Sequence, residues 1–226
     1  DCVSGGKGDP EIHIVEGDSA AGSAKQGRDR NYQAILPLRG KVLNTESATL
    51  KKILENKEIQ DLVAALGCGI GPNMTVANLR YERVILLADA DSDGHHITTL
   101  LLTFFYRHMP GLISSGRLYI AVPPLYRIDI GKETYWAKDE AAREEILAEH
   151  VGRANPEITR FKGLGEMMPK VLWETTLNPE TRTIQRVEID DQLETDRVIS
   201  ELMGRDASAR FRFIMDRADT AEAIDV

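Results

Sequence analysis

This sequence of 226 residues has only two cysteines, and it lacks long hydrophobic runs and an excess of basic residues. Its two cysteines, Cys2 and Cys68, form no CxxC pair, which excludes a disulfide or zinc framework and favours a reducing compartment such as the cytoplasm. The longest apolar stretch, residues 100–106, is far too short to span a bilayer, and we find no signal peptide, so we expect no membrane partner. The net charge of −8 excludes binding of nucleic acid through bulk positive charge alone, but not through a local basic strip.

The sequence also has no methionine before Met74 and no G-x-x-x-x-G-K nucleotide loop. We therefore expect a piece of a longer protein. The composition is that of a globular protein, with 42% hydrophobic and 28% charged residues. A chain of this length is long enough for one large domain or two small ones.

Apolar segments alternate with helical patterns over residues 1–138, which predicts an α/β fold with a parallel, Rossmann-like sheet. Residues 11–16 form a short apolar strand, and Asp18 or Ser19 is placed to cap the helix that follows. Residues 83–88 form a continuous apolar strand of the kind buried on both faces of a parallel sheet. Residues 139–226 begin with an acidic helix and predict a smaller α+β tail domain, although both parts could share one core.

The sharpest local feature is the acidic hexapeptide DADSDG at 89–94, directly after the second of these strands. Parallel sheets present ligand sites at the carboxyl ends of their strands. Three carboxylates packed so closely repel one another, which favours a bound cation. Mg²⁺ prefers few carboxylates and completes its coordination with water and phosphate oxygens. The simpler alternative, a solvated acidic turn, is disfavoured because a buried strand leads straight into it.

Three kinds of site share this acidic pattern. An EF-hand requires a bidentate Glu at its twelfth position. Counted from Asp89, that position is Leu100, so the segment is not an EF-hand. Phosphotransferases of the haloacid-dehalogenase type also place DxD after a strand, but they usually carry Thr or Val where this chain has Asp93. The third kind adds a separate acid at the end of an earlier strand, and Glu16 fits that role.

A basic strip lies between the two acidic sites in the sequence. Residues 25–41 carry five basic residues against Asp29, a local charge of +4. This pattern indicates contact with a phosphate backbone beside the metal, with a solvated helix end as the alternative. Lys162 extends the strip, and His95 and His96 follow the acids, where they are suited to hydrogen-bond a phosphate or carboxylate.

Together, EGDSA (16–20) and DADSDG (89–94) resemble the Toprim metal site. Further motifs resemble the B subunits of bacterial type IIA topoisomerases, DNA gyrase and topoisomerase IV, in the same order: PLRGK (37–41), LLLT (100–103), PPLY (123–126), KGLGEM (162–167) and NPETR (178–182). The resemblance runs from about residue 9 to about residue 204 and covers only the carboxyl-terminal, Toprim-plus-tail half of that subunit. It implies that the ATPase and transducer domains, and with them ATP, lie outside this chain.

The resemblance also implies roles for individual residues. Glu16, Asp89 and Asp91 are the implied catalytic residues, and together with Asp93 they are the implied ligands of Mg²⁺, for which Mn²⁺ or Ca²⁺ can substitute in binding. Lys41, Asn44 and His96 match positions that contact DNA near the scissile bond. Asp18 and Arg39 match the region where quinolone antibiotics act.

The implied function is Mg²⁺-dependent cleavage and religation of double-stranded DNA in a bacterial, chromosome-associated cytoplasmic enzyme. The attacking tyrosine comes from the A subunit of an A₂B₂ heterotetramer, which the tail domain contacts. The full ATP-driven enzyme supercoils or decatenates DNA, and this fragment alone is expected to be inactive. Another Toprim enzyme, such as a primase or nuclease, and a haloacid-dehalogenase-like phosphotransferase remain as alternatives.

Overall fold

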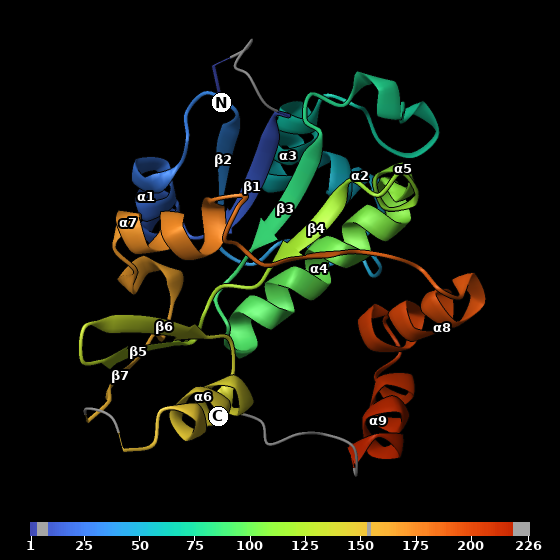
Figure 1. Ribbon diagram of the computed structural model, residues 1–226. Coiled ribbons are helices and arrows are strands. Elements are labelled where there is room, and N and C mark those ends of the chain that lie inside the picture. Colours follow the sequence, from blue (N-terminus) through green and yellow to red (C-terminus); the bar gives the residue numbers. More distant parts are fainter. Residues whose placement is uncertain (4–8, 153–154, 219–226) are drawn as a thin grey trace.

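A five-stranded sheet forms the centre of the protein (Figure 1) in the computed structural model, which describes residues 1–3, 9–152 and 155–218. Its strands are, in spatial order, β2 (Gln33–Leu38), β1 (Glu11–Glu16), β3 (Arg83–Leu87), β4 (Leu118–Ala121) and β8 (Ile184–Arg186). The first four strands are mutually parallel, and β8 pairs antiparallel with β4. The α/β fold with a parallel sheet is therefore confirmed, with one antiparallel edge strand added from beyond residue 138.

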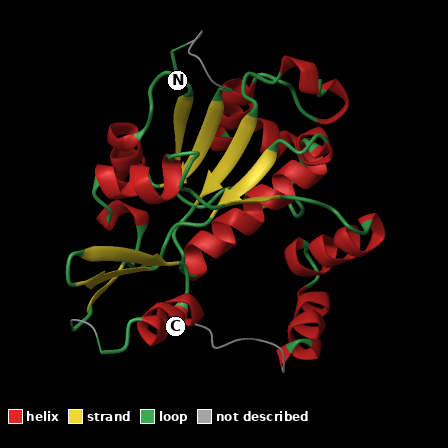
Figure 2. Cartoon of the chain, in the orientation of Figure 1, coloured by secondary structure: helices red, strands yellow, loops and turns green. Residues whose placement is uncertain are grey.

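Helices cover both faces of this sheet (Figure 2). The α-helices of the described residues are α1 (Asp18–Gly27), α2 (Leu50–Glu55), α3 (Lys57–Leu66), α4 (Ser92–His108), α5 (Pro110–Ser114), α6 (Glu140–Glu149), α7 (Pro169–Leu172), α8 (Gln192–Met203) and α9 (Ala207–Asp216), of which α6 packs on a second sheet. Alternate strand residues point to opposite faces, so Ile12 and Ile14 join the apolar cluster under α3 and α4, whereas Val15 joins the cluster under α1. No helix of the described ranges has the length and apolar character that a membrane span requires.

A second, antiparallel sheet has the order β6-β5-β7, and α6 packs against it through Ile146 and Leu147. Its strands are β5 (Tyr126–Ile130), β6 (Glu133–Ala137) and β7 (Glu157–Arg160). This sheet combines strands from both sides of residue 138. The division into domains at that residue stays a prediction, and the structure shows that sheets and core are shared across it.

The chain beyond β7 returns to the main sheet through short helical turns. These are η3 (Leu164–Glu166), α7 and the π-turn η4 (Trp173–Leu177), where the sequence predicts one helix ending near Thr175. Leu164, Leu172 and Leu177 are buried in the cluster under α1. Gly17, not Asp18 or Ser19, occupies the N-cap of α1, and no side chain caps that helix, so the predicted cap is wrong.

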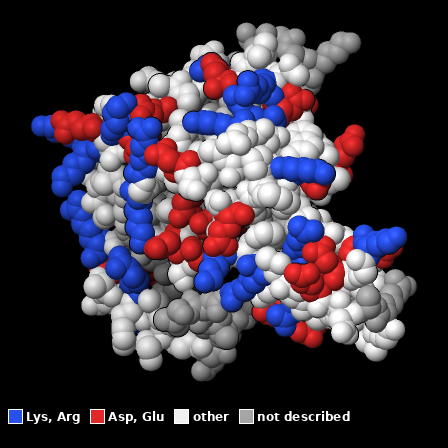
Figure 3. All heavy atoms as spheres, turned by 90° about the vertical axis from the view of Figure 1, so that its left-hand side faces the viewer, with Lys and Arg blue, Asp and Glu red and all other residues white. Residues whose placement is uncertain are grey.

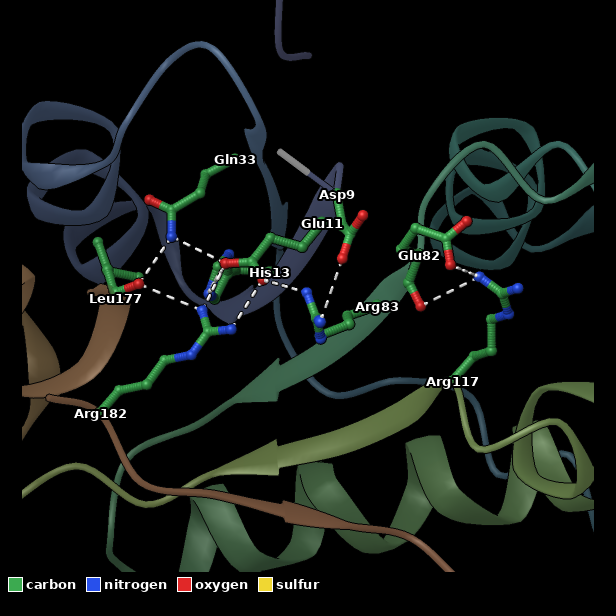
Figure 4. A network of polar contacts seen from close by, with 9 residues as sticks. All are labelled: Asp9, Glu11, His13, Gln33, Glu82, Arg83, Arg117, Leu177 and Arg182. Carbon is green, nitrogen blue, oxygen red and sulfur yellow. Dashed lines mark hydrogen bonds and ion pairs between the residues drawn. The ribbon is translucent and has the colours of Figure 1, made fainter. Parts of the chain in front are cut away.

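A buried polar network fastens this returning segment to the edge of the sheet (Figure 4). Glu11 on β1 accepts two hydrogen bonds from the guanidinium of Arg182, of which the Nη2–Oε2 bond is 2.8 Å long. Gln33 on β2 donates from Nε2 to Glu11 Oε1 at 2.8 Å and to the carbonyl oxygen of Leu177 at 2.7 Å. Burial acts to raise the pKa of Glu11, but the bonds and charge of Arg182, with smaller contributions from His13 and Gln33, lower it overall. The carboxylate is therefore charged and fully paired inside the protein.

His13 lies beside Glu11 in this network and is completely buried. Among the described residues, neither ring nitrogen makes a hydrogen bond, and Glu11 Oε1 lies 3.8 Å from Nε2. Burial lowers the pKa of His13 from 6.5 to about 4, and Arg182 adds to this effect although Glu11 opposes it. The imidazole is neutral in the folded protein at neutral pH.

The buried neutral His13 predicts a pH dependence of stability. Folding lowers the pKa of His13, so the folded state is favoured when the imidazole is neutral. This contribution to the free energy of unfolding is fully present above pH 6.5 and is lost as the pH falls toward about 4. We expect the free energy of unfolding of the chain to fall by about 3 kcal/mol more than that of a His13→Leu variant over this window. Urea unfolding of both proteins at several pH values measures the difference. Parallel pH profiles for the two proteins would contradict the prediction.

Candidate metal centre

Two of the predicted acidic residues meet at the carboxyl ends of neighbouring strands. β1 and β3 are adjacent and parallel, with Val15 opposite Leu87, so both chains leave the sheet at the same edge. Glu16 ends β1, and its Oε2 accepts a hydrogen bond of 3.1 Å from the backbone N–H of Asp89. The structure thus brings together the separate acid and the first carboxylate of the DADSDG segment.

The rest of the DADSDG segment forms a tight turn that starts α4. Asp91 is the N-cap of this helix, and its Oδ1 accepts a hydrogen bond of 2.8 Å from the N–H of Gly94. A Cβ on Gly94 would lie 2.0 Å from the carbonyl oxygen of Asp89, so only glycine allows the helix to begin this close to the strand end. The turn fixes Asp89 and Asp91 relative to each other.

The third side of the site comes from the loop between β7 and η3. The N–H of Leu164 donates to Asp89 Oδ1 at 2.8 Å. This loop and the ends of β1 and β3 line a depression of about 510 Å³ that is open to solvent. Its lining residues are Glu16, Gly17, Ser19, Ala20, Asp89, Lys162, Gly163, Gly165 and Glu166. The sequence singled out Glu16 and Asp89 and included Lys162, but it missed the contribution of the two loop glycines and the Leu164 N–H.

The acids in this depression repel one another. Burial raises the pKa of Glu16, and the nearby carboxylates of Asp89, Asp91 and Asp93 raise it further, against the hydrogen bond from Asp89. Burial likewise raises the pKa of Asp89, with Asp91 and Glu166 adding to the effect against the hydrogen bond from Leu164. A positive ion between these groups would relieve both effects.

Two exposed ion pairs lie at the rim of the site. Lys41 Nζ lies 2.7 Å from Asp93 Oδ1, and its hydrogen bond and charge lower the pKa of Asp93. Arg39 Nε lies 3.5 Å from Asp18 Oδ1, so the two residues predicted for the drug region contact each other. Such exposed pairs contribute little to stability, and their side chains are available to a ligand.

The remaining predicted DNA contacts occupy different environments. His96 is exposed on the first turn of α4, close enough to Asp93 for its charge to lower that carboxyl's pKa. Asn44 instead donates from Nδ2 to the carbonyl oxygen of Met203 at 2.8 Å, and its Oδ1 accepts from the N–H of Glu46. Asn44 therefore joins the segment after β2 to the end of α8 in this structure.

The surface around the site is unevenly charged despite the net charge of −8. Figure 3, which faces the side of the protein that carries α1 and α7, shows Lys and Arg side chains gathered along one edge with acidic side chains clustered beside them. Basic and acidic groups thus lie side by side on this face. A polyanion can contact the basic edge while a cation occupies the acidic cluster.

The donor set fits a magnesium ion that is only partly coordinated by protein. Within the ranges that the structure describes, no three Asp, Glu, His or Cys side chains gather closely enough to hold a metal by themselves. Mg²⁺ is usually bound by one or two carboxylates together with water and substrate phosphate. Glu16 and Asp89 line the depression and supply such oxygens.

Comparison with known proteins matches two families along the chain. The Toprim domain matches residues 11–123, which include β1, β3 and the acidic site. The carboxyl terminus of the DNA gyrase B subunit matches residues 153–215. These matches favour the Toprim interpretation of the DxD pattern over the phosphotransferase alternative.

Individual relatives match the whole chain. The DNA gyrase B subunits of Haloferax volcanii and of Thermotoga maritima are each 51% identical over 226 residues, which is 100% of this chain and 35% of each relative. The DNA topoisomerase 4 B subunit of Caulobacter vibrioides is 52% identical over 224 residues, 99% of this chain and 32% of the relative. The chain thus spans about a third of the length of the curated relatives it matches. It belongs to the Toprim family, among the members whose Toprim domain is followed by the carboxyl-terminal region of the DNA gyrase and topoisomerase IV B subunits.

Proposed function

We propose that this chain is the DNA cleavage and religation part of the B subunit of a type IIA topoisomerase. The observation that carries the proposal is the pairing of Glu16 with Asp89 at the ends of adjacent parallel strands, in a depression open to a phosphodiester. In the described part of the chain, no tyrosine lines this depression. This arrangement agrees with an attacking tyrosine that comes from a partner A subunit, in an A₂B₂ assembly on double-stranded DNA at the chromosome in the cytoplasm.

Each residue of the site has a definite task in this proposal. Glu16 and Asp89 hold Mg²⁺, with Asp91 and Asp93 as further ligands in the loaded enzyme. The ion, when bound, offsets the negative charge that develops on the phosphate and on the departing 3′ oxygen. Glu16, whose carboxylate lies beside Asp89 at the open side of the site, is also proposed to handle a proton during religation.

The rim residues position the nucleic acid. Lys41 is exposed beside the acids, where its ammonium can exchange Asp93 for a backbone phosphate. His96 and Asn44 are the further DNA contacts that we propose. Asp18 and Arg39, which pair at the mouth of the depression, form the surface where quinolones act.

The test uses the full-length protein with the A subunit from the same genome, Mg²⁺ and supercoiled plasmid. We expect double-strand breaks, trapped by detergent, only when both subunits and the metal are present, and loss of breaks on chelation. Each subunit alone should leave the plasmid intact. Nicking by this protein without an A subunit would overturn the proposal and favour a Toprim nuclease.

A second assay assigns the topoisomerase type. Relaxed plasmid and interlinked circles are each incubated with both full-length subunits and ATP. Introduction of negative supercoils identifies a gyrase, whereas decatenation and relaxation without supercoiling identify a topoisomerase IV. Failure of all three reactions with an active A subunit would contradict the proposed function.

A further inference from the structure

The loop of residues 162–166, here called the KGLGE loop, reaches Asp89 from a distant part of the sequence. Its contact is made by the backbone, because the N–H of Leu164 donates to Asp89 Oδ1 at 2.8 Å, across 75 positions of the chain. Hydrogen bonds from backbone N–H groups to a carboxylate are strong and directional. One oxygen of Asp89 is therefore held in a fixed direction by a group outside its own turn.

The same loop packs closely against the second oxygen of Asp89. A Cβ on Gly163 would lie 2.7 Å from Asp89 Oδ2 and 3.2 Å from Cγ. Gly163 has φ −163° and ψ 163°, an extended conformation that any residue adopts, so glycine is not needed there for its backbone freedom. What glycine provides at this position is room for the carboxylate.

The KGLGE loop is itself firmly anchored. Leu164 and Met167 are buried in the apolar cluster under α1. Glu166 Oε2 accepts a hydrogen bond of 3.0 Å from the N–H of Lys162, which closes the loop on itself. Gly165 packs on the first turn of α1, where a Cβ would lie 2.7 Å from Ser19 Oγ. A group held in this way can impose a direction on Asp89 instead of following it.

We infer that the KGLGE loop positions the Asp89 carboxylate, with the Leu164 N–H fixing Oδ1 and Gly163 allowing the loop to lie against Oδ2 without displacing it. The inference rests on the proposed function, because it concerns the same metal site. Gly163 and Leu164 are positioning residues, since they act through Asp89. A methyl group at position 163 would meet the end of a side chain and not the backbone, so the carboxylate would move while the fold is kept.

The first test measures Mn²⁺ binding to the full-length protein without nucleotide, by electron paramagnetic resonance, together with thermal melting. Asp89→Asn gives the background from other sites. Gly163→Ala is expected to weaken Mn²⁺ affinity at the Asp89 site by about 10- to 100-fold, the range seen when groups that orient a ligand are lost. Its melting temperature should stay within about 3 °C of the wild type. Gly22→Ala is the matched control, because a Cβ on Gly22 in α1 meets nothing within 4 Å.

A second pair of variants isolates the hydrogen bond. Leu164→Pro and Leu164→Ala both lose the buried leucine side chain, but only proline also loses the N–H. Position 164 begins η3 after an extended residue, a place that accepts proline. At a temperature where both are folded, we expect Leu164→Pro to bind Mn²⁺ about 10-fold or more weakly than Leu164→Ala, because only the proline variant lacks the N–H.

These experiments distinguish the metal role of Asp89 from the positioning role of the KGLGE loop. Equal Mn²⁺ binding by the wild type and Asp89→Asn would refute both the metal role of Asp89 and the positioning role of the loop. Weak binding by Asp89→Asn with wild-type binding by Gly163→Ala and Leu164→Pro would overturn the loop inference alone. With both subunits and DNA, the inference further predicts that Gly163→Ala raises the Mg²⁺ concentration for half-maximal cleavage while Gly22→Ala does not.

Discussion

The substitution Asp89→Asn is expected to lower the rate of Mg²⁺-dependent DNA cleavage by the assembled enzyme on the order of 10²- to 10³-fold. The physical reason is that Asp89 is the half-buried carboxylate shared by all three sides of the site. It touches Glu16 through its N–H and Leu164 through Oδ1. An amide keeps the shape of the side chain but removes the charge that would attract the metal. Single-turnover cleavage of a DNA duplex with the partner A subunit measures the effect.

Asp61→Asn is the control for this experiment. Asp61 is an exposed acid on α3 that pairs with Lys57 and lies outside the depression. Its loss of charge should leave the cleavage rate unchanged. The metal role would be refuted if an enzyme carrying both Asp89→Ala and Asp91→Ala still cleaved DNA at the wild-type rate.

Replacing Arg182 by Ala is expected to lower the free energy of unfolding of the chain by about 3–5 kcal/mol. Arg182 and Glu11 are almost completely buried, with side-chain exposures of 5% and 1%. Removing Arg182 leaves Glu11 as a buried charge, near Gln33, the neutral His13 and Arg83. Urea unfolding measures the loss, and the segment between β7 and β8 should exchange its amide hydrogens faster.

Arg197→Ala provides a matched arginine whose ion pairs are exposed. Arg197 pairs with Glu194 and Glu201 on the surface of α8, and we expect its loss to lower the free energy of unfolding far less than the loss of Arg182 does. A combined Glu11→Gln and Arg182→Met protein should recover part of the stability lost by Arg182→Ala, because it leaves no buried charge unpaired. Equal effects of Arg182→Ala and Arg197→Ala would show that burial does not govern the contribution of these pairs.

Much of the fold could be predicted because the signals are local. The continuous apolar run of β3 predicts burial on both faces, and the structure packs Leu86 against one helical layer and Leu87 against the other. Strands alternating with helices predict a parallel sheet, which the structure confirms for β1 to β4. The prediction of one helix that follows Gly165 and ends near Thr175 is wrong. The structure has a 3-10 turn, one α turn and a π-turn over residues 164–177, and their buried leucines pack against α1.

The sequence by itself determined the chemistry of the site. Glu16 ends one apolar strand and Asp89 follows another, and the carboxyl ends of parallel strands lie at one edge of a sheet. That these two strands are neighbours comes from the structure. Carboxylates that lie this close repel one another, and a bound cation stabilises them irrespective of the surrounding loops. The functional roles of these residues stay predictions that the cleavage and binding experiments test.

Only the tertiary structure decided how the site is held. The structure shows that Leu164 donates a hydrogen bond to Asp89, and that Arg182 donates one to Glu11 across 171 positions of the chain. It also shows two ion pairs, Arg39 with Asp18 and Lys41 with Asp93. It also adds β8 to the sheet, although the sequence assigned that segment to a separate tail. Side-chain periodicity describes a few neighbouring residues, whereas these contacts depend on which distant segments pack against the same surface. That choice is made by the burial of Leu164, Leu172 and Leu177 under α1, a property of the whole fold.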